Sequence, residues 1–279
     1  MNYINYNGKL LDATTALVGA GNRGLRYGDG LFETMKVNNG KLQFAADHFD
    51  RLWHGLGVLG FELPPLFTKE KLQAEVIALG AKNGHLLSGR TRLNLFRGEG
   101  GLFDAENNYP NYIIESWSLS AGYSEFNPNG LVLAIYADAR KTCDVLANLK
   151  HNNYLPYVLA ALHAKKEKCN DALLLNSMGR ICDSTIANIF IVKNQQVITP
   201  GLDEGCVAGV LRKNLIAHLA ATGFNISEKA VTIDDVLTAD EVFLTNSMFN
   251  IRWVQRIADR AYRSDYTRKI YASFLPTIF

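Results

Sequence analysis

The stretch Ser120–Gly130 (SAGYSEFNPNG) interrupts a chain of 279 residues close to its middle. It is rich in turn-forming residues and poor in aliphatic ones, whereas apolar segments of strand and helix length lie on both sides of it. Each side is long enough to bury a hydrophobic core of its own. We therefore predict a smaller α+β domain over residues 1–120, a linker over 121–130 and a larger domain over 131–279.

The first side of this linker carries the patterns of strands and of two helices. The pair Asn39-Gly40 predicts a tight hairpin, because glycine tolerates a positive φ. Apolar residues at helical spacing predict a helix over 46–59, and a second helix over 69–82 has Thr68 as its N-cap. Strands are expected over 35–37, 41–44, 90–97 and 112–119.

The second side mixes strands and helices in no regular order. We predict one helix that follows Lys150 and ends near residue 168, and another over 209–222 that stops at Gly223. Strands are expected over 131–137, 172–175, 186–192, 197–199 and 241–245, with an irregular segment and a short amphipathic tail after the last. Because βαβ regularity is missing, the predicted fold class is α+β rather than doubly wound α/β.

Composition excludes several classes of partner. Lysine and arginine number 29 and aspartate and glutamate 27, and a net charge of +2 does not indicate binding to nucleic acid or anionic membranes. The apolar runs are far shorter than the ~20 residues of a membrane span, and Met1–Tyr6 lacks the features of a signal peptide. Four scattered cysteines fit free thiols in a reducing cytoplasm, and the histidines form no zinc-binding pattern. We expect a cytoplasmic protein without a metal.

Lys150 is the first candidate for chemistry. It lies in the segment 148–155 (NLKHNNYL), between an apolar strand and a predicted helix and among polar neighbours. A lysine that faces a closed pocket has a lowered pKa and can form a Schiff base. Taken alone, the segment also fits a solvated lysine at the start of a helix.

Four further groups could serve a ligand. Asp183 could cap a turn or pair with a protonated ring nitrogen of a cofactor. The helix start Gly205–Arg212 offers backbone N–H groups to a phosphate, and Arg51 could add a bidentate contact. The segment Thr245–Ser247 follows a strand that looks buried. Each also has an ordinary structural interpretation as a cap, a ligand-free helix start or a solvated helix face.

Two arginines lie on one predicted strand. Arg92 and Arg97 share residues 90–97, and Arg97 leads into the glycine-rich segment Gly98–Gly101. Guanidinium groups beside such a loop suit a substrate that bears a carboxylate. The alternative is a charged outer face of a sheet.

In their order along the chain, these segments resemble a known family. Arg23–Thr34 (RGLRYGDGLFET) is similar to the N-terminal signature of the class-IV, fold-type-IV pyridoxal-phosphate enzymes. That family includes branched-chain aminotransferases, D-amino-acid aminotransferases and 4-amino-4-deoxychorismate lyase. The further matching segments, in the family's order and over essentially the whole chain, are His48-x-x-Arg51-Leu52, Arg97–Gly101, Lys150-x-x-Asn153-x-Leu155, Asp171–Leu175, Asn188–Phe190, Gly209–Arg212 and Ala239–Phe243. The resemblance implies a two-domain α+β fold of the D-amino-acid aminotransferase type, with pyridoxal 5'-phosphate bound by the larger domain.

The resemblance also implies residue roles. Lys150 would be the catalytic residue that forms the Schiff base with the cofactor aldehyde and moves protons. Tyr154 would contact the ring 3-oxygen, although this chain has one residue fewer between lysine and tyrosine than the aminotransferases. The cofactor phosphate would be held by Arg51, the backbone N–H groups of Val210 and Leu211, and Ser247.

Two positions depart from the family's pattern. Asp183 stands where the family usually has Glu, and would keep the pyridine nitrogen protonated so that the ring accepts electrons. Aspartate is one methylene shorter, so this contact could lengthen or run through water. Leu211 stands where aminotransferases often place Thr, which removes one hydroxyl bond to the phosphate and keeps the amide.

The resemblance leaves the reaction open. Residues 32–34, Lys150-His151-x-Asn153 and 245–247 are similar to the lyases, which release pyruvate from 4-amino-4-deoxychorismate and give 4-aminobenzoate for folate synthesis. Asn153–Leu155 is similar to the branched-chain enzymes, so a branched-chain or D-amino-acid aminotransferase is the alternative. A catalytically silent cofactor-binding relative is a second alternative, supported by the departure at Asp183.

The expected substrate is a small molecule with an amino group and a carboxylate. Its candidate pocket residues are Tyr27, Phe32, Arg92 and Arg97. Members of the family are usually homodimers, so we expect a homodimer that binds neither nucleic acid nor membranes.

Overall fold

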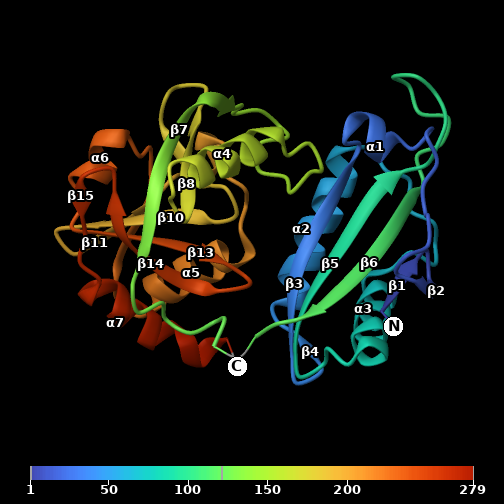
Figure 1. Cartoon of the computed structure of the whole chain (residues 1–279), viewed down its shortest axis with the longest axis horizontal. Coiled ribbons are helices and arrows are strands. Elements are labelled where there is room, and N and C mark those ends of the chain that lie inside the picture. The colour runs from blue at the N-terminus through green and yellow to red at the C-terminus, as the bar shows by residue number, and fades with distance from the viewer. Residues whose placement is uncertain (1, 121, 279) are drawn as a thin grey trace. The chain divides into compact units, whose positions relative to one another are not determined.

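The computed structural model describes residues 2–120 and 122–278, and within it the chain forms two compact units (Figure 1). The units are Met1–Tyr123 with Leu149–Asn153, and Ser124–Asn148 with Tyr154–Phe279. The α+β fold class is confirmed. The domain limits at 120 and 131 stay a prediction, and residue 121 of the predicted linker lies outside the described residues.

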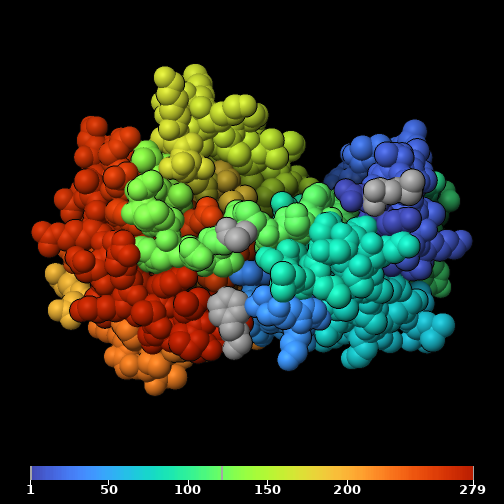
Figure 2. Space-filling model, turned by 60° about the horizontal axis from the view of Figure 1, so that its bottom comes forward, coloured from blue at the N-terminus to red at the C-terminus, as the bar shows by residue number. Residues whose placement is uncertain are grey.

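The first unit contains a six-stranded antiparallel sheet in the order β2-β1-β6-β5-β3-β4, together with three helices. Its elements are β1 (Tyr3–Tyr6), β2 (Lys9–Asp12), α1 (Arg23–Tyr27), β3 (Gly30–Asn38), β4 (Lys41–Leu42), α2 (Ala45–Val58), α3 (Lys69–Asn83), β5 (Ser88–Arg97) and β6 (Pro110–Ser118). In Figure 2, α3 and its neighbouring segments (cyan to teal) form much of the visible surface of this unit.

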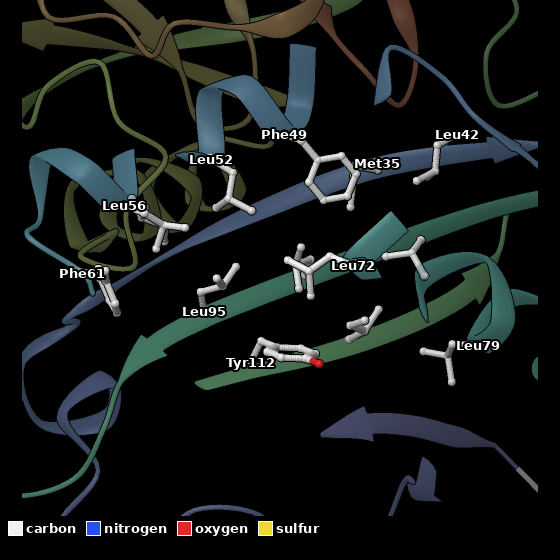
Figure 3. Close-up of a cluster of buried hydrophobic side chains, with 14 of the residues drawn as sticks. Met35, Leu42, Phe49, Leu52, Leu56, Phe61, Leu72, Leu79, Leu95 and Tyr112 are labelled. Atoms are coloured by element: carbon white, nitrogen blue, oxygen red, sulfur yellow. The ribbon is translucent and has the colours of Figure 1, made fainter. Parts of the chain in front are cut away.

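Helices α2 and α3 cover one face of this sheet, and their apolar side chains meet those of β3, β5 and β6 (Figure 3). In α2 the buried residues Phe49, Leu52 and Leu56 recur every three or four positions, which is the period of one helix face. They pack in one cluster with Met35 of β3 and Leu95 of β5, both fully buried. This spacing is why the sequence predicts a helix over 46–59, close to the observed bounds.

The predicted hairpin is present, but its second strand is shorter than expected. Asn39 and Gly40 both have positive φ, at 48° and 74°. The second strand β4 ends at Leu42 rather than at residue 44. Phe44 has a φ of 49° and turns the chain into α2, so the strand cannot continue.

The second unit contains a nine-stranded mixed sheet in the order β12-β11-β10-β13-β14-β7-β8-β9, with β15 beside β14. Its strands are β7 (Leu131–Lys141), β8 (Asp171–Asn176), β9 (Ile181–Ser184), β10 (Asn188–Lys193), β11 (Gln196–Thr199), β12 (Asn225–Glu228), β13 (Glu241–Asn246), β14 (Asn250–Ile257) and β15 (Arg260–Ala261). Its helices are α4 (Leu155–Lys166), η1 (Leu202–Glu204), α5 (Val210–Ala221), α6 (Ile233–Leu237), α7 (Asp265–Phe274) and η2 (Leu275–Thr277).

The prediction of an irregular segment after β13 is wrong. Residues Asn250–Ile257 form β14, which lies in the sheet between β13 and β7. Its burial does not alternate, because Arg252 and Trp253 are half-buried neighbours and Gln255 and Arg256 are exposed neighbours. The strand therefore shows no period of two in the sequence.

The C-terminal helix α7 is fixed to the second unit by a buried carboxylate. Glu241 of β13 accepts hydrogen bonds from Tyr266 N at 2.8 Å and from Thr267 N and Oγ1, both at 2.7 Å. These bonds satisfy amides of the first turn of α7, which have no partner within the helix. Figure 2 shows the C-terminal residues (red) spread over the surface of this unit.

The structure can also be examined for membrane-spanning helices, metal sites and disulfides. No helix in the described ranges is both long enough and apolar enough to cross a bilayer. The same residues contain no cluster of three His, Cys, Asp or Glu side chains arranged to hold a metal ion. The cysteines at 143, 169, 182 and 206 are free thiols.

We expect Leu56→Ala to lower the free energy of unfolding by about 3 kcal/mol, because it leaves a cavity in the core between α2 and the sheet. Leu87→Ala is the matched control, since Leu87 is 74% exposed and the change should stay within about 0.5 kcal/mol. Urea denaturation followed by circular dichroism measures both. Equal losses in the two variants would contradict the assignment of this core.

Candidate active site

The residue Lys150 is held by backbone hydrogen bonds to the start of β3. Phe32 N donates to Lys150 O at 2.9 Å, and Asn152 N donates to Gly30 O at 2.9 Å. A bridge between Leu31 and His151 lies between these two bonds. The segment Leu149–Asn153 therefore belongs to the first unit although the chain on both sides of it belongs to the second, and α4 begins later than predicted.

This pairing requires a residue without a side chain at position 30. A Cβ atom on Gly30 would lie 2.0 Å from Leu95 O and 2.7 Å from Asn152 Nδ2, which is closer than non-bonded atoms can approach. Asn152 Nδ2 itself donates to Leu95 O at 3.1 Å. Because Gly30 has no side chain, the segment that carries Lys150 can pack against β3.

Asp29 is fixed by two buried arginines. Arg23 Nε and Arg97 Nε donate to its Oδ2 at 2.9 and 3.0 Å. Arg97 Nη2 also donates to Leu59 O at 2.5 Å, and its Nη1 donates to Asn108 Oδ1 at 2.7 Å. The structure therefore places Arg97, a predicted substrate residue, in a buried network that positions the loop before β3.

Arg23 also fastens the loop that follows β5. Its Nη1 donates to the carbonyl oxygens of Gly100 and Leu102 at 3.3 and 2.7 Å, and its Nη2 donates to Phe103 O at 3.0 Å. The side chains of Leu102 and Phe103 remain 71% and 89% exposed. Tyr27, another predicted substrate residue, is exposed and has its ring centroid 6.2 Å from that of Phe103.

Arg51 is oriented by a buried carboxylate of β3. Its Nε donates to Glu33 Oε1 at 2.8 Å and its Nη2 donates to Glu33 Oε2 at 2.5 Å, while His48 Nδ1 lies 2.8 Å from Glu33 Oε2. Burial opposes ionisation of Glu33, but Arg51 and His48 outweigh it and lower its pKa to about 2. The guanidinium therefore has a fixed direction, with an ionised partner at every physiological pH.

Arg51 and Lys150 both lie close enough to His48, in the first unit, to affect its pKa. Burial lowers the pKa of His48, Glu33 opposes this effect, and the positive charges of Arg51 and Lys150 lower the pKa further. Its Nε2 atom is buried and has no hydrogen-bond partner among the described residues. The region therefore has a nitrogen that a polar ligand could satisfy.

Phe32 lies beside two cationic side chains. The centre of its ring is 4.5 Å from Lys150 Nζ and 3.9 Å from the guanidinium carbon of Arg92. Arg92 stands opposite Thr34 in the pairing of β5 with β3, as an alternating strand requires. Two of the predicted substrate residues and the predicted catalytic lysine are thus neighbours within the first unit.

Asp183 is the hub of a buried cluster in the second unit. Its Oδ2 accepts hydrogen bonds from Lys141 Nζ at 2.8 Å, Tyr157 OH at 2.9 Å and Val207 N at 2.9 Å. Its Oδ1 accepts from Asn188 Nδ2 at 2.9 Å. Only 2% of Asp183 is exposed, so the turn-cap interpretation gives way to a buried carboxylate held by four donors.

The helix α5 begins in the same unit without a capping side chain. Its N-cap is Gly209, and a Cβ atom there would lie 1.9 Å from Asn188 Oδ1. The first-turn amides of Val210 and Leu211 therefore have no side-chain acceptor from the cap. Such amides, together with the helix dipole, make this end of α5 suitable for an anion.

Two further predicted residues lie in the second unit. Tyr154 precedes α4, and its ring stacks on Tyr157 with a centroid distance of 4.1 Å and an interplanar angle of 15°. Ser247 follows β13 in a turn that Asn246 closes by accepting from the amides two and three residues later. Near the end of this strand, Thr245 Oγ1 is buried and lacks a hydrogen-bond partner within the described ranges.

Sequence reasoning missed several polar side chains that fix the predicted ones. Glu33 and His48 stand inside the quoted motifs, and the helical spacing from His48 to Arg51 indicates a shared face that needs a counter-charge. The partners Lys141 and Tyr157 carry no such signal, because they lie 42 and 26 residues from Asp183.

Comparison with known proteins identifies the family. The model of the family described as amino-transferase class IV matches residues 30–257. The chain is 29% identical over 248 residues to aminodeoxychorismate lyase of Vibrio harveyi, covering 88% of this chain and 89% of that one. It is 26% identical over 266 residues to branched-chain-amino-acid aminotransferase of Pseudomonas aeruginosa, covering 91% and 84%.

A solved structure gives the same result. The crystal structure of 4-amino-4-deoxychorismate lyase from Pseudomonas aeruginosa has a TM-score of 0.83 and 28% identity, and 98% of each chain is covered. Because the family model spans most of the chain and relatives align over nearly all of it, the chain belongs to the class IV aminotransferase family.

Proposed function

We propose that this member of the family is a 4-amino-4-deoxychorismate lyase, which releases pyruvate and forms 4-aminobenzoate. Enzymes of the family use pyridoxal 5'-phosphate. The observation that carries the proposal is the group around Phe32, where a lysine amine and the Arg92 guanidinium lie beside one aromatic ring. This group suits a substrate in which an amine and a carboxylate are attached to a ring.

The residues present fit the cofactor. The first turn of α5 lacks a side-chain cap, which leaves amides for a phosphate. Buried polar atoms without partners among the described residues, His48 Nε2 and Thr245 Oγ1, are what a bound polar molecule would satisfy. Asp183 is a buried carboxylate, which is the kind of acceptor that a protonated ring nitrogen needs.

Each side chain then has a role that its surroundings support. When bound, pyridoxal phosphate supplies an electron sink for the carbon that carries the substrate amino group. Lys150 takes and returns a proton at Nζ, for which it must be neutral. Asp183 would accept a hydrogen bond from the protonated ring nitrogen, and Tyr154 OH would contact the ring 3-oxygen. The phosphate would take Val210 N, Leu211 N and Ser247 from the second unit, and Arg51 is the proposed contact from the first.

Glu33 fixes the orientation of the Arg51 guanidinium, whether or not a phosphate is bound. It engages two of the guanidinium nitrogens, and its lowered pKa keeps it ionised. An arginine fixed in this way binds an anion with little loss of side-chain entropy on binding.

The substrate carboxylate is assigned to Arg92, with Phe32 and Tyr27 as apolar walls. Arg97 is buried, and its hydrogen bonds support a role in which it positions Asp29 and does not contact the substrate. Transamination is the second candidate, favoured by the stretch Asn153–Leu155 and by the branched-chain relative.

A homodimer is the proposed assembly. Helix α4 exposes four apolar side chains at the spacing of one helix face: Leu155, Val158, Leu159 and Leu162. A stripe of this kind is typical of a protein–protein interface.

The free thiols support a reducing compartment such as the cytoplasm.

Incubation of the purified protein with 4-amino-4-deoxychorismate should release pyruvate and 4-aminobenzoate in equal amounts. Incubation with leucine and 2-oxoglutarate, the matched control, should form no glutamate. Both products can be quantified by liquid chromatography. Glutamate formation without any pyruvate would establish the aminotransferase alternative instead.

Lys150→Ala should abolish the absorbance band of the Schiff base between cofactor and protein and reduce pyruvate release by about 10³-fold or more, because the variant lacks the amine that forms this bond and moves the proton. Lys165→Ala is the control, since Lys165 is an exposed lysine of α4. A Schiff-base band that persists in Lys150→Ala would assign the cofactor to another amine.

Leu159→Glu should convert the dimer to a monomer in light scattering, because it places a charge within the apolar stripe of α4. Leu66→Glu, at a position that is 78% exposed in the first unit, should leave the mass at twice that of one chain. A wild-type protein that is monomeric at every concentration would refute the assembly.

A further inference from the structure

The cluster around Asp183 contains a lysine for which the proposed reaction has no use. Lys141 Nζ lies 2.8 Å from Asp183 Oδ2, and the side chains are 7% and 2% exposed. Tyr157 donates to the same oxygen, and its ring centre lies 5.0 Å from Lys141 Nζ. A buried lysine–carboxylate pair of this kind is costly to desolvate, so its presence calls for a function.

An irregularity in β7 brings Lys141 to this cluster. Tyr136 and Lys141 lie five residues apart, and strict alternation would put them on opposite faces of the sheet. The pairing of β7 with β8 shifts its register between these two residues, which re-aims the later side chain. Tyr136 and Lys141 consequently both lie on the side of the sheet where Tyr157 packs.

The charges of the cluster are well defined. Burial lowers the pKa of Lys141, but the charge and hydrogen bond of Asp183, together with the neighbouring Cys182 and Cys206, outweigh it, so the net shift is upward and the ammonium persists. Burial and Asp183 raise the pKa of Tyr157, so its hydroxyl remains a donor. The thiols of Cys182 and Cys206 also face the cluster, and burial raises the pKa of both, to about 12 for Cys206. At neutral pH these thiols and Tyr157 are therefore uncharged, and Asp183 faces a cation.

The four donors occupy the two oxygens of Asp183 unequally. Oδ2 receives three hydrogen bonds, whereas Oδ1 receives one, from Asn188. A carboxylate has about two lone-pair directions on each oxygen. One direction on Oδ1 is therefore left for a further donor.

We infer that Lys141 is a positioning residue that acts through Asp183. By binding Oδ2, it leaves Oδ1 to face the ring nitrogen of the cofactor. Its positive charge also makes Asp183 a weaker partner for the proton on the ring nitrogen. This inference rests on the proposed role of Asp183 toward pyridoxal phosphate. Its consequence is a ring nitrogen that is less fully protonated than an unpaired aspartate would make it.

The protonation of the ring nitrogen can be measured directly. We would load the apoprotein with pyridoxal phosphate labelled with ¹⁵N in the ring and record its chemical shift without substrate. In Lys141→Met the signal should move toward the protonated position, because the ring nitrogen becomes the counter-ion of Asp183. Lys141→Gln, which keeps a donor and removes the charge, should shift in the same direction if the methionine variant does not fold.

Two variants provide the controls. Lys141→Arg should keep the wild-type signal, because it keeps the positive charge beside Asp183. Asp183→Asn should move the signal toward the unprotonated position. An unshifted signal in cofactor-loaded Lys141→Met or Lys141→Gln would overturn this inference alone, whereas a wild-type protein that binds no cofactor would overturn the proposed function with it.

The ion pair itself can be tested in the apoprotein. Lys141→Met should lower Tm by roughly 10 °C, because it leaves an unpaired buried carboxylate. Adding Asp183→Asn to that variant should restore most of the loss. Without such recovery, Lys141 would be a packing residue only.

Discussion

Backbone hydrogen bonds between β3 and the segment Lys150–Asn152 determine where the side chain of Lys150 starts. These bonds exist because Gly30 has no side chain, and no other residue type could avoid the carbonyl of Leu95. The next residue, Leu31, faces α2, where a Cβ atom on Gly55 would lie only 2.8 Å from its Cδ1. Two glycines thus let the lysine segment and α2 approach the same strand.

Charged side chains also join α2 to β3. Glu33 projects from β3 toward His48 and Arg51 of α2, and Asp183 holds an equivalent place in the second unit with Lys141. Buried ion pairs contribute little net stability, since desolvation offsets their attraction. What they provide is direction, because a guanidinium or carboxylate held by several hydrogen bonds has one orientation available to a ligand.

The sequence could predict what depends on local patterns. The helices over 46–59 and 69–82 follow from apolar spacing and capping, and the ordered motifs indicate the family that the comparisons confirm. The strand β14 could not be predicted, because its buried residues do not alternate with exposed ones. The pair Lys141–Asp183 was also missed, since it results from a register shift in β7 and joins residues far apart in the chain.

The anchoring of the loop after β5 has an evolutionary consequence. Arg23 binds this loop through the carbonyl oxygens of Gly100, Leu102 and Phe103, which every amino acid possesses. The exposed side chains at 102 and 103 can therefore be exchanged over generations while the path of the chain is inherited unchanged. A descendant could acquire a new molecular preference at this tip through a few codon changes, without first having to rebuild the scaffold beneath it.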